Sequence, residues 1–253
     1  MTANSVKVDY TGISKIYDSY RSYPDSLIKI IIALGRISLG KKVLDLGCGT
    51  GNISRQIKNN VDADFTGVDL SLDMLKVAKS KSLEVVCIDI DNKQLPFHNN
   101  SFDAVVGAYI IHQIKNLNLL LSECYRVLGN GVLVLLTSSH QQIEDQHPII
   151  KDFFPSYVSI DKGRFPDINK IDDMLSSIGF KEIKHEVVTV ANIPIDHEYL
   201  QKVKSKYVST YHLIPQSEFE DGIARLEAFI TNNNRPQYKD WHGTIISALK
   251  IID

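Results

Sequence analysis

Residues 43–51 read Val-Leu-Asp-Leu-Gly-Cys-Gly-Thr-Gly, and this stretch decides the fold class. The apolar residues before Gly47 predict a short buried strand. Glycines at 47, 49 and 51 let the backbone take positive φ angles and turn tightly. A tight turn between a parallel strand and a helix is where α/β sheets bind nucleotides. Asn52 stands where a dinucleotide fingerprint has its third glycine, so the spacing argues against an NAD-dependent dehydrogenase and favours another nucleoside ligand.

Further stretches follow this loop in a fixed order along the chain. They read Phe-Thr-Gly-Val-Asp-Leu-Ser at 65–71, Ile-Asp-Ile at 88–90, Gln-Leu-Pro-Phe at 94–97, Ser-Phe-Asp-Ala-Val-Val at 101–106, Glu-Cys-Tyr-Arg-Val-Leu at 123–128 and Val-Leu-Val-Leu-Leu at 132–136. Over roughly residues 40–140 this order resembles the class I methyltransferases that depend on S-adenosyl-L-methionine (SAM). The resemblance is to the small-molecule type, similar to the methyltransferase domain of ubiquinone and menaquinone biosynthesis.

The hydrophobic pattern and the resemblance agree on an α/β fold. Strands expected near 42–46, 64–68, 84–88, 102–107 and 131–137 alternate with helices, which predicts a parallel sheet covered on both faces. Two later strands are expected at 181–190 and 241–251, and a helix at 168–178 ending at Gly179. The resemblance implies a Rossmann-like, mostly parallel seven-stranded sheet, with helices on both faces and a helical cap over its carboxyl edge.

The chain divides by the same reasoning into a core and three additions. We expect an N-terminal helical lid at 1–39, a SAM-binding core at 40–139 and a cap insertion at 140–166. The rest of the core follows at 167–253, with cap helices at about 196–235. The placement of the additions over the carboxyl edge is implied by the resemblance.

The resemblance assigns the cofactor's methionine part to the glycine loop. Gly47 and Gly49 would let the backbone approach it, and Cys48 would be a small filler. Asp45 is the acid of this motif. It would either order the loop or lie near the amino group of SAM, and a carboxylate that caps the glycine turn is the alternative.

The nucleoside part is assigned to the ends of the next two strands. Asp69 ends a predicted strand, where an acid can accept hydrogen bonds from ribose hydroxyls, and a helix-capping acid is the alternative. Asp89 and Ile90 resemble the family's adenine contacts, with Asp91 as the competing acid. Leu70 and Met74 would flank the adenine or simply belong to the core; Ser71 is the expected N-cap of the following helix.

Two further segments carry candidates for the reacting end of the site. His112 follows the fourth strand in the stretch from Ala108 to Ile114, which in small-molecule members faces the transferred methyl group. An imidazole there could accept a proton from the acceptor, or it could only pack. The resemblance also implies that Tyr20 and Arg21 could close over SAM and bind its carboxylate; the alternative is that they pack on the core.

The composition of the chain limits the classes of partner and the cellular setting that we expect. The net charge is −2 with no concentrated basic stretch, which argues against nucleic acid. The N-terminus lacks the apolar core of a signal peptide, and apolar runs are too short to span a bilayer. Cys48, Cys87 and Cys124 form no C-x-x-C pair, so we expect no disulfide framework or zinc site and a cytoplasmic setting. The spacing of His140, Glu144 and His147 would align metal ligands on one helix face, but Pro148 follows at once and we expect no metal.

The resulting hypothesis is a SAM-dependent methyltransferase that acts on a small molecule. An RNA or protein methyltransferase of the same fold is the first alternative. Enzymes that methylate an exocyclic base amine usually have Asn/Asp-Pro-Pro-Tyr/Phe after strand four, where this chain has Gly-Ala-Tyr-Ile at 107–110. A SAM-binding protein without turnover is the second alternative. The acceptor and the oligomeric state cannot be read from the sequence.

Overall fold

The computed structural model describes residues 18, 23–233 and 235–252, so Tyr20 and Arg21 lie outside the described residues. The chain divides into two compact units, which we describe separately. The sheet unit comprises the described residues of 10–137, 167–187 and 244–253, and the helical unit those of 138–166 and 188–243. Strands β6 and β7 contribute residues to both units.

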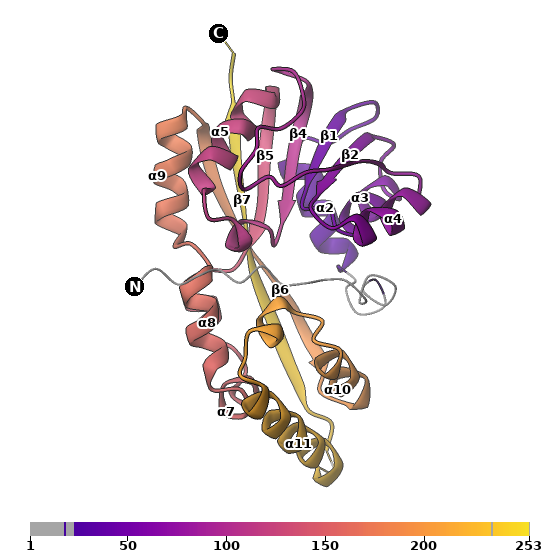
Figure 1. The fold of residues 1–253 in the computed structure, drawn as a ribbon, viewed down its shortest axis with the longest axis vertical. Coiled ribbons are helices and arrows are strands. Elements are labelled where there is room, and N and C mark those ends of the chain that lie inside the picture. The colour runs from indigo at the N-terminus through magenta and orange to yellow at the C-terminus, as the bar shows by residue number, and fades with distance from the viewer. Residues whose placement is uncertain (1–17, 19–22, 234, 253) are drawn as a thin grey trace. The chain divides into compact units, whose positions relative to one another are not determined.

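The sheet unit is built on seven strands in the order β3-β2-β1-β4-β5-β7-β6 (Figure 1). Strands β1 to β5 pair in parallel, and β7 runs antiparallel to β5. The expected mostly parallel seven-stranded sheet is therefore confirmed. The strands are β1 (Lys42–Leu46), β2 (Asp64–Asp69), β3 (Glu84–Cys87), β4 (Phe102–Ala108), β5 (Leu128–Thr137), β6 (Lys181–Pro194) and β7 (Tyr238–Lys250).

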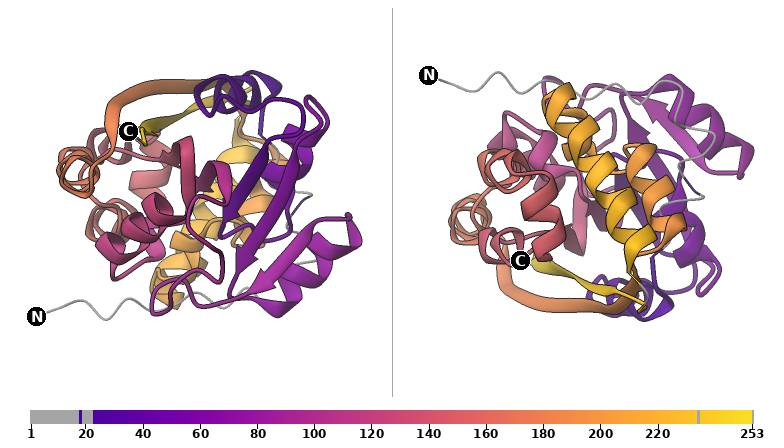
Figure 2. Two further views of the ribbon diagram at one scale, coloured as in Figure 1. Left: turned by 90° about the horizontal axis from the view of Figure 1, so that it is seen from above. Right: turned by 90° about the horizontal axis from the view of Figure 1, so that it is seen from below.

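Helices cover both faces of this sheet, as expected. One group is α2 (Asp25–Leu34), α3 (Asn52–Lys58) and α4 (Leu72–Ser80), in which α2 packs against α3, and α4 against β2 and β3. The other is α5 (Leu117–Val127) and α9 (Ile168–Ile178), which pack on each other (Figures 1 and 2). Right-handed crossovers explain this division, because the strand order runs one way from β1 to β3 and the other way from β4 to β5.

Local signals set the helix ends. The Ser71 side chain accepts a hydrogen bond from the Met74 amide and caps α4 as predicted. Asn116 caps α5 in the same way. Gly179 ends α9 with φ of 116°, which confirms the expected helix at 168–178.

The topological switch point lies between β1 and β4. These strands are neighbours, yet the chain proceeds from β1 toward β2 and from β4 toward β5. Their carboxyl ends are level, since Leu46 is in register with Gly107 as well as with Val68. Ligands of open α/β sheets bind in the crevice that opens at such a point.

The helical unit contains three helices from the predicted insertion and two after β6. They are α6 (His140–Glu144), α7 (Pro148–Phe153), α8 (Ser156–Arg164), α10 (His197–Lys204) and α11 (Gln216–Asn232), with the short 3-10 segment η2 (Ser209–His212). Helices α10 and α11 pack side by side (Figure 2). Aromatic side chains form the core of this unit, with the Tyr211 ring 5.2 Å from Phe154 and 5.4 Å from Tyr157.

The single helix that would align His140, Glu144 and His147 does not form. Helix α6 ends at Glu144, and His147 is the N-cap of α7. His140 instead bonds through Nε2 to the Phe165 carbonyl oxygen at 2.8 Å. Among the described residues no group of three His, Cys, Asp or Glu side chains could hold a metal ion. Within residues 18, 23–233 and 235–252, no helix has the length and apolar character needed to cross a membrane.

Replacement of Lys250 by methionine should destabilise the sheet unit by about 2–4 kcal/mol. The buried Lys250 Nζ donates to the Asn100 side chain and to the Tyr125 and Leu128 carbonyl oxygens, at 2.6–2.8 Å. Methionine would leave these acceptors without the donor that holds β7 beside β5. Urea unfolding measures the effect, with exposed Lys184→Met as the control. Equal stability of the two variants would contradict this role.

Candidate active site

The glycine loop follows β1 and has one open position. Gly47, Gly49 and Gly51 have φ of 61°, 53° and 72°. A Cβ at Gly47 would lie 2.5 Å from the Ile110 side chain, and one at Gly51 would lie 2.9 Å from Leu83. A Cβ at Gly49 would meet no atom of the described residues within 4 Å. The loop is therefore packed at its two ends and open at Gly49, where a ligand could approach the backbone.

Asp69 ends β2 and ties the glycine loop to the start of α4. Its Oδ2 accepts a hydrogen bond from the Gly49 amide at 2.9 Å, and its Oδ1 accepts one from the Ser71 amide at 2.8 Å. Burial raises the pKa of this carboxyl group, while the backbone donors oppose the rise. The helix-capping alternative thus describes one of its contacts, and the side chain stays partly accessible at the strand end.

Asp45 lies beneath the loop and is 2% exposed. Its Oδ2 accepts a hydrogen bond from the Ser54 hydroxyl of α3 at 2.5 Å. Burial raises the pKa of Asp45 to about 7, the Ser54 hydrogen bond opposes this rise, and the nearby Asp69 charge adds to it. Asp45 therefore joins β1 to α3 across the loop, which is the loop-ordering geometry.

This raised pKa predicts a pH-dependent stability. The folded protein binds the Asp45 proton more tightly than the unfolded chain, so stability should fall as pH rises from about 4 to about 7. Asp45→Asn should remove on the order of a few kcal/mol of that change. Urea unfolding at about pH 5 and about pH 8 measures the slope. An unchanged slope in Asp45→Asn would show that Asp45 is ionised throughout.

The remaining motif residues divide into buried and accessible ones. Cys48 is 7% exposed, and burial raises its thiol pKa, which favours the neutral thiol and fits a small filler. Met74 is 3% exposed and belongs to the core, whereas Leu70, beside Asp69, is 50% exposed. An exposed leucine at the carboxyl end of β2 offers an apolar surface to a ring.

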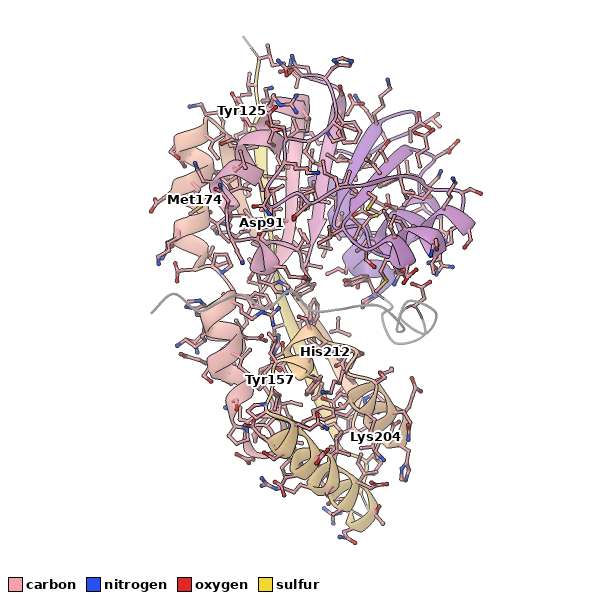
Figure 3. All side chains as sticks on the ribbon, viewed as in Figure 1. Asp91, Tyr125, Tyr157, Met174, Lys204 and His212 are labelled. Carbon is pink, nitrogen blue, oxygen red and sulfur yellow. The ribbon has the colours of Figure 1, made fainter. Side chains whose placement is uncertain are left out.

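The two acids after β3 have different surroundings. Asp89 is partly exposed, and its Oδ1 accepts a hydrogen bond from the Asp91 amide at 3.2 Å. Asp91 is 3% exposed, and its Oδ1 accepts the amides of Lys115 and Asn116 at 2.8 and 2.9 Å (Figure 3). Asp91 therefore holds the start of α5, which leaves Asp89 as the more accessible acid. Ile90 between them is 7% exposed.

An ion pair on α5 supports the loop after Asp91. Arg126 pairs with Glu123 at 2.7 Å and donates to the carbonyl oxygens of Leu95 and Phe97. Glu123 in turn accepts the Leu95 amide at 2.8 Å. The resemblance included these residues, but their function in fixing the loop after β3 was not visible from their spacing.

Asp18 links the N-terminal segment to the glycine loop. Its carboxylate accepts the Thr50 hydroxyl at 2.5 Å and also pairs with Lys81, which donates to the Thr50 carbonyl oxygen at 2.7 Å. Asp18 precedes Tyr20 and Arg21 by two and three residues. No motif pointed to Asp18, because a single acid in a tyrosine-rich segment has no distinctive pattern.

The carboxyl end of β4 completes this edge of the sheet. Ala108 is the last residue of β4 and is partly exposed, and Tyr109 follows with φ of 53°, a strained value for a tyrosine. His112 lies in the 3-10 turn η1 (Ile111–Gln113), is 7% exposed and meets the Tyr109 ring edge-on at 6.4 Å. Strain next to a switch point is a signal of function that the sequence did not give.

Comparisons with known proteins agree with this geometry. A family model described as a methyltransferase domain matches residues 44–136. A demethylmenaquinone methyltransferase of Porphyromonas gingivalis is 29% identical over 182 residues, which cover 58% of this chain and 73% of the relative.

Two solved structures share the fold. One, from Anabaena variabilis, is described as a candidate methyltransferase of an antibiotic biosynthesis pathway. It superposes with a TM-score of 0.73 at 22% identity, over 91% of this chain and 99% of the other. The other is a Haemonchus contortus phosphoethanolamine N-methyltransferase in complex with phosphomonomethylethanolamine and S-adenosylhomocysteine. Its TM-score is 0.57 at 20% identity, over 89% of this chain and 52% of the other.

The sheet order, the open glycine loop and the family match together define a class I SAM-dependent methyltransferase. Residues 44–136 thus match a methyltransferase domain, the chain is similar to SAM-dependent methyltransferases that act on small molecules, and its cofactor is SAM.

Proposed function

We propose that this methyltransferase holds SAM along the carboxyl ends of β1, β2 and β3 and presents its methyl group in line to an oxygen, nitrogen or carbon atom of a small-molecule acceptor. The observation that carries the proposal is the open side of Gly49, on a loop fixed by Asp69 at the switch point. Sheets of this kind bind nucleosides there.

The residues present fit the three parts of the cofactor. The loop at Gly47 and Gly49 would receive the methionine part, with Asp45 below it and Cys48 as filler. Asp69 keeps unused lone pairs for ribose hydroxyls, since each of its oxygens accepts one amide. Leu70 would cover one face of the adenine, and Asp89 with the Ile90 amide would bind its edge. Met74 supports this surface from the core.

Methyl transfer requires the protein to position the acceptor and the methyl donor. SAM supplies an electrophilic methyl group on a sulfonium. The chain must orient the acceptor opposite that methyl group and exclude water, and positioning alone can lower a barrier by about 7–11 kcal/mol in ideal cases. We propose that Ala108 lines the end of β4 beside the cofactor and that His112 accepts the acceptor's proton where one is released. Tyr20 and Arg21 are the proposed closing residues on the N-terminal side.

Calorimetric titration with SAM, S-adenosylhomocysteine and NAD tests the proposal. Binding of the first two and not of NAD is expected. Binding of NAD alone, or of none of the three, would contradict it. Methyl transfer is then measured with labelled SAM on a panel that includes the acceptors named for the relatives, demethylmenaquinone and phosphomonomethylethanolamine. SAM binding with no methyl transfer to any acceptor would favour the alternative of a SAM-binding protein without turnover.

His112→Gln separates proton transfer from binding. If His112 is a general base, kcat should fall by about 10²–10⁴-fold while the Kd for SAM stays the same. The loss should be largest for an acceptor whose nucleophile carries a proton at the working pH. A kcat near that of wild type with a hydroxyl acceptor would show that His112 only packs against Tyr109.

The kind of acceptor, the cellular setting and the cap are each proposed from a single observation. The absence of a concentrated basic stretch favours a small molecule over RNA or protein. The three free cysteines fit a reducing, cytoplasmic setting. The helices of 140–166 and 196–235 are the proposed cap that selects the acceptor.

A further inference from the structure

A buried lysine in the helical unit has no ionic partner among the described residues. Lys239 stands near the start of β7 and is 8% exposed. Among the described residues, none accepts a hydrogen bond from its Nζ or forms an ion pair with it. Its recorded contact is with the ring of Tyr199 on α10, 5.6 Å from the ring centroid. That distance is near the outer limit of a cation–π interaction, which is weak compared with the cost of burying an ammonium group.

The nearest carboxylate is engaged elsewhere. Asp240 follows Lys239 directly, so its side chain points to the opposite face of the strand. Asp240 is exposed, and its Oδ1 accepts the Asn192 amide at 2.9 Å. Burial lowers the pKa of Lys239 to about 8, and Asp240 offsets this only in part. The ammonium form therefore still prevails at neutral pH.

His147 is a second hydrogen-bond donor that is affected by the charge of Lys239. His147 caps α7 by accepting the Ile149 amide at Nδ1, at 3.3 Å, so the neutral ring carries its proton on Nε2. Burial and the positive charge of Lys239 lower the pKa of His147, while Asp240 opposes the shift. Lys239 beside the Tyr199 ring therefore offers a buried donor with no anion among the described residues, and His147, whose pKa its charge lowers, offers a second donor at Nε2.

We propose that Lys239 and His147 form a subsite within the helical unit that binds an anion, a phosphate or a carboxylate. The ligand would provide the counter-charge that Lys239 lacks among the described residues, and Tyr199 would lie beside the Lys239 ammonium group. This inference goes beyond the proposed methyltransferase function and does not depend on it.

The test titrates the full chain, saturated with S-adenosylhomocysteine, with inorganic phosphate and separately with acetate. Wild type should bind at least one of them. Lys239→Met should bind it at least about tenfold more weakly, because a charge-assisted hydrogen bond is lost. Lys204→Met is the matched control, since Lys204 is exposed on α10 of the same unit and pairs with Glu227 (Figure 3). It should bind like wild type.

The outcomes distinguish the sources and the two proposals. Tighter binding of phosphate points to a phosphorylated ligand, and tighter binding of acetate to a carboxylate. No anion binding by wild type, or equal binding by Lys239→Met, overturns the subsite. If S-adenosylhomocysteine still binds in that case, the methyltransferase proposal survives. Should Lys239→Met fail to fold, side-chain NMR of Lys239 in wild type replaces it, and an unchanged Lys239 signal on adding the anion overturns the subsite.

Discussion

Replacement of Asp69 by alanine is expected to weaken SAM binding by about 100-fold or more. The substitution removes the acceptor proposed for the ribose hydroxyls. It also removes the two amide contacts that fix Gly49 and the start of α4, so the loop would lose its alignment with the cofactor. Calorimetric titration with SAM and S-adenosylhomocysteine measures the loss.

Two variants make this prediction specific. Asp73→Ala is the control, because Asp73 lies in the first turn of α4 and pairs with Lys76 on the surface; it should bind SAM like wild type. Asp69→Asn keeps an acceptor oxygen but loses the charge, so its Kd should lie between those of wild type and Asp69→Ala. A Kd for Asp69→Ala within about threefold of wild type would contradict the ribose role, since the lost contacts predict far more.

Alanine at Gly49 should strongly weaken cofactor binding while the fold stays stable, whereas alanine at Gly47 should chiefly lower the stability of the fold. Both glycines have positive φ, 53° and 61°, so the backbone cost of alanine, about 1 kcal/mol, is matched. The space around them differs. A methyl group at 49 enters the open side of the loop, whereas one at 47 lies 2.5 Å from Ile110.

Two measurements separate these effects. Gly49→Ala should lose about 100-fold or more in SAM affinity with a small change in the urea midpoint, because a methyl group occupies the cofactor's approach. Gly47→Ala should lose about 1–3 kcal/mol more stability through overpacking. The double variant Gly47→Ala with Ile110→Ala should recover part of that loss. Full SAM affinity in Gly49→Ala would place the cofactor elsewhere.

The sheet could be predicted because its signals are local and repeat along the chain. Residues 43–51 state a strand and its turn, and the later strands follow as apolar runs between turn signals. Gly179 ends α9 through its positive φ, and the Ser71 side chain caps the start of α4, so these two helix boundaries could also be predicted from the sequence. Strand β6 was underestimated: it continues to Pro194 rather than Val190, although most of its residues are exposed and carry no burial pattern.

The site was harder to predict where it depends on contacts distant in sequence. Asp89 and Asp91 are both aspartates two residues apart, so the sequence does not distinguish them. In the structure, Asp91 accepts hydrogen bonds from the two amides before α5. Asp18 contacts Thr50 across 32 positions, and Lys239 is buried near the ring of Tyr199, which lies 40 positions before it in the sequence. Tyr109 takes a positive φ that tyrosine seldom adopts, and only tertiary context can impose this. Such features follow from packing rather than from a motif.

The position of β7 has a consequence for biosynthesis. It is synthesised after β5 and β6, but in the sheet it lies between them rather than at an edge. While the ribosome is still adding residues 238–250, β6 therefore has no neighbour through which to join the sheet, and β5 exposes an unpaired backbone edge. Unpaired edges in nascent chains invite aggregation. Lys250, the final residue of β7, would then close the sheet with its three hydrogen bonds only when synthesis has passed it.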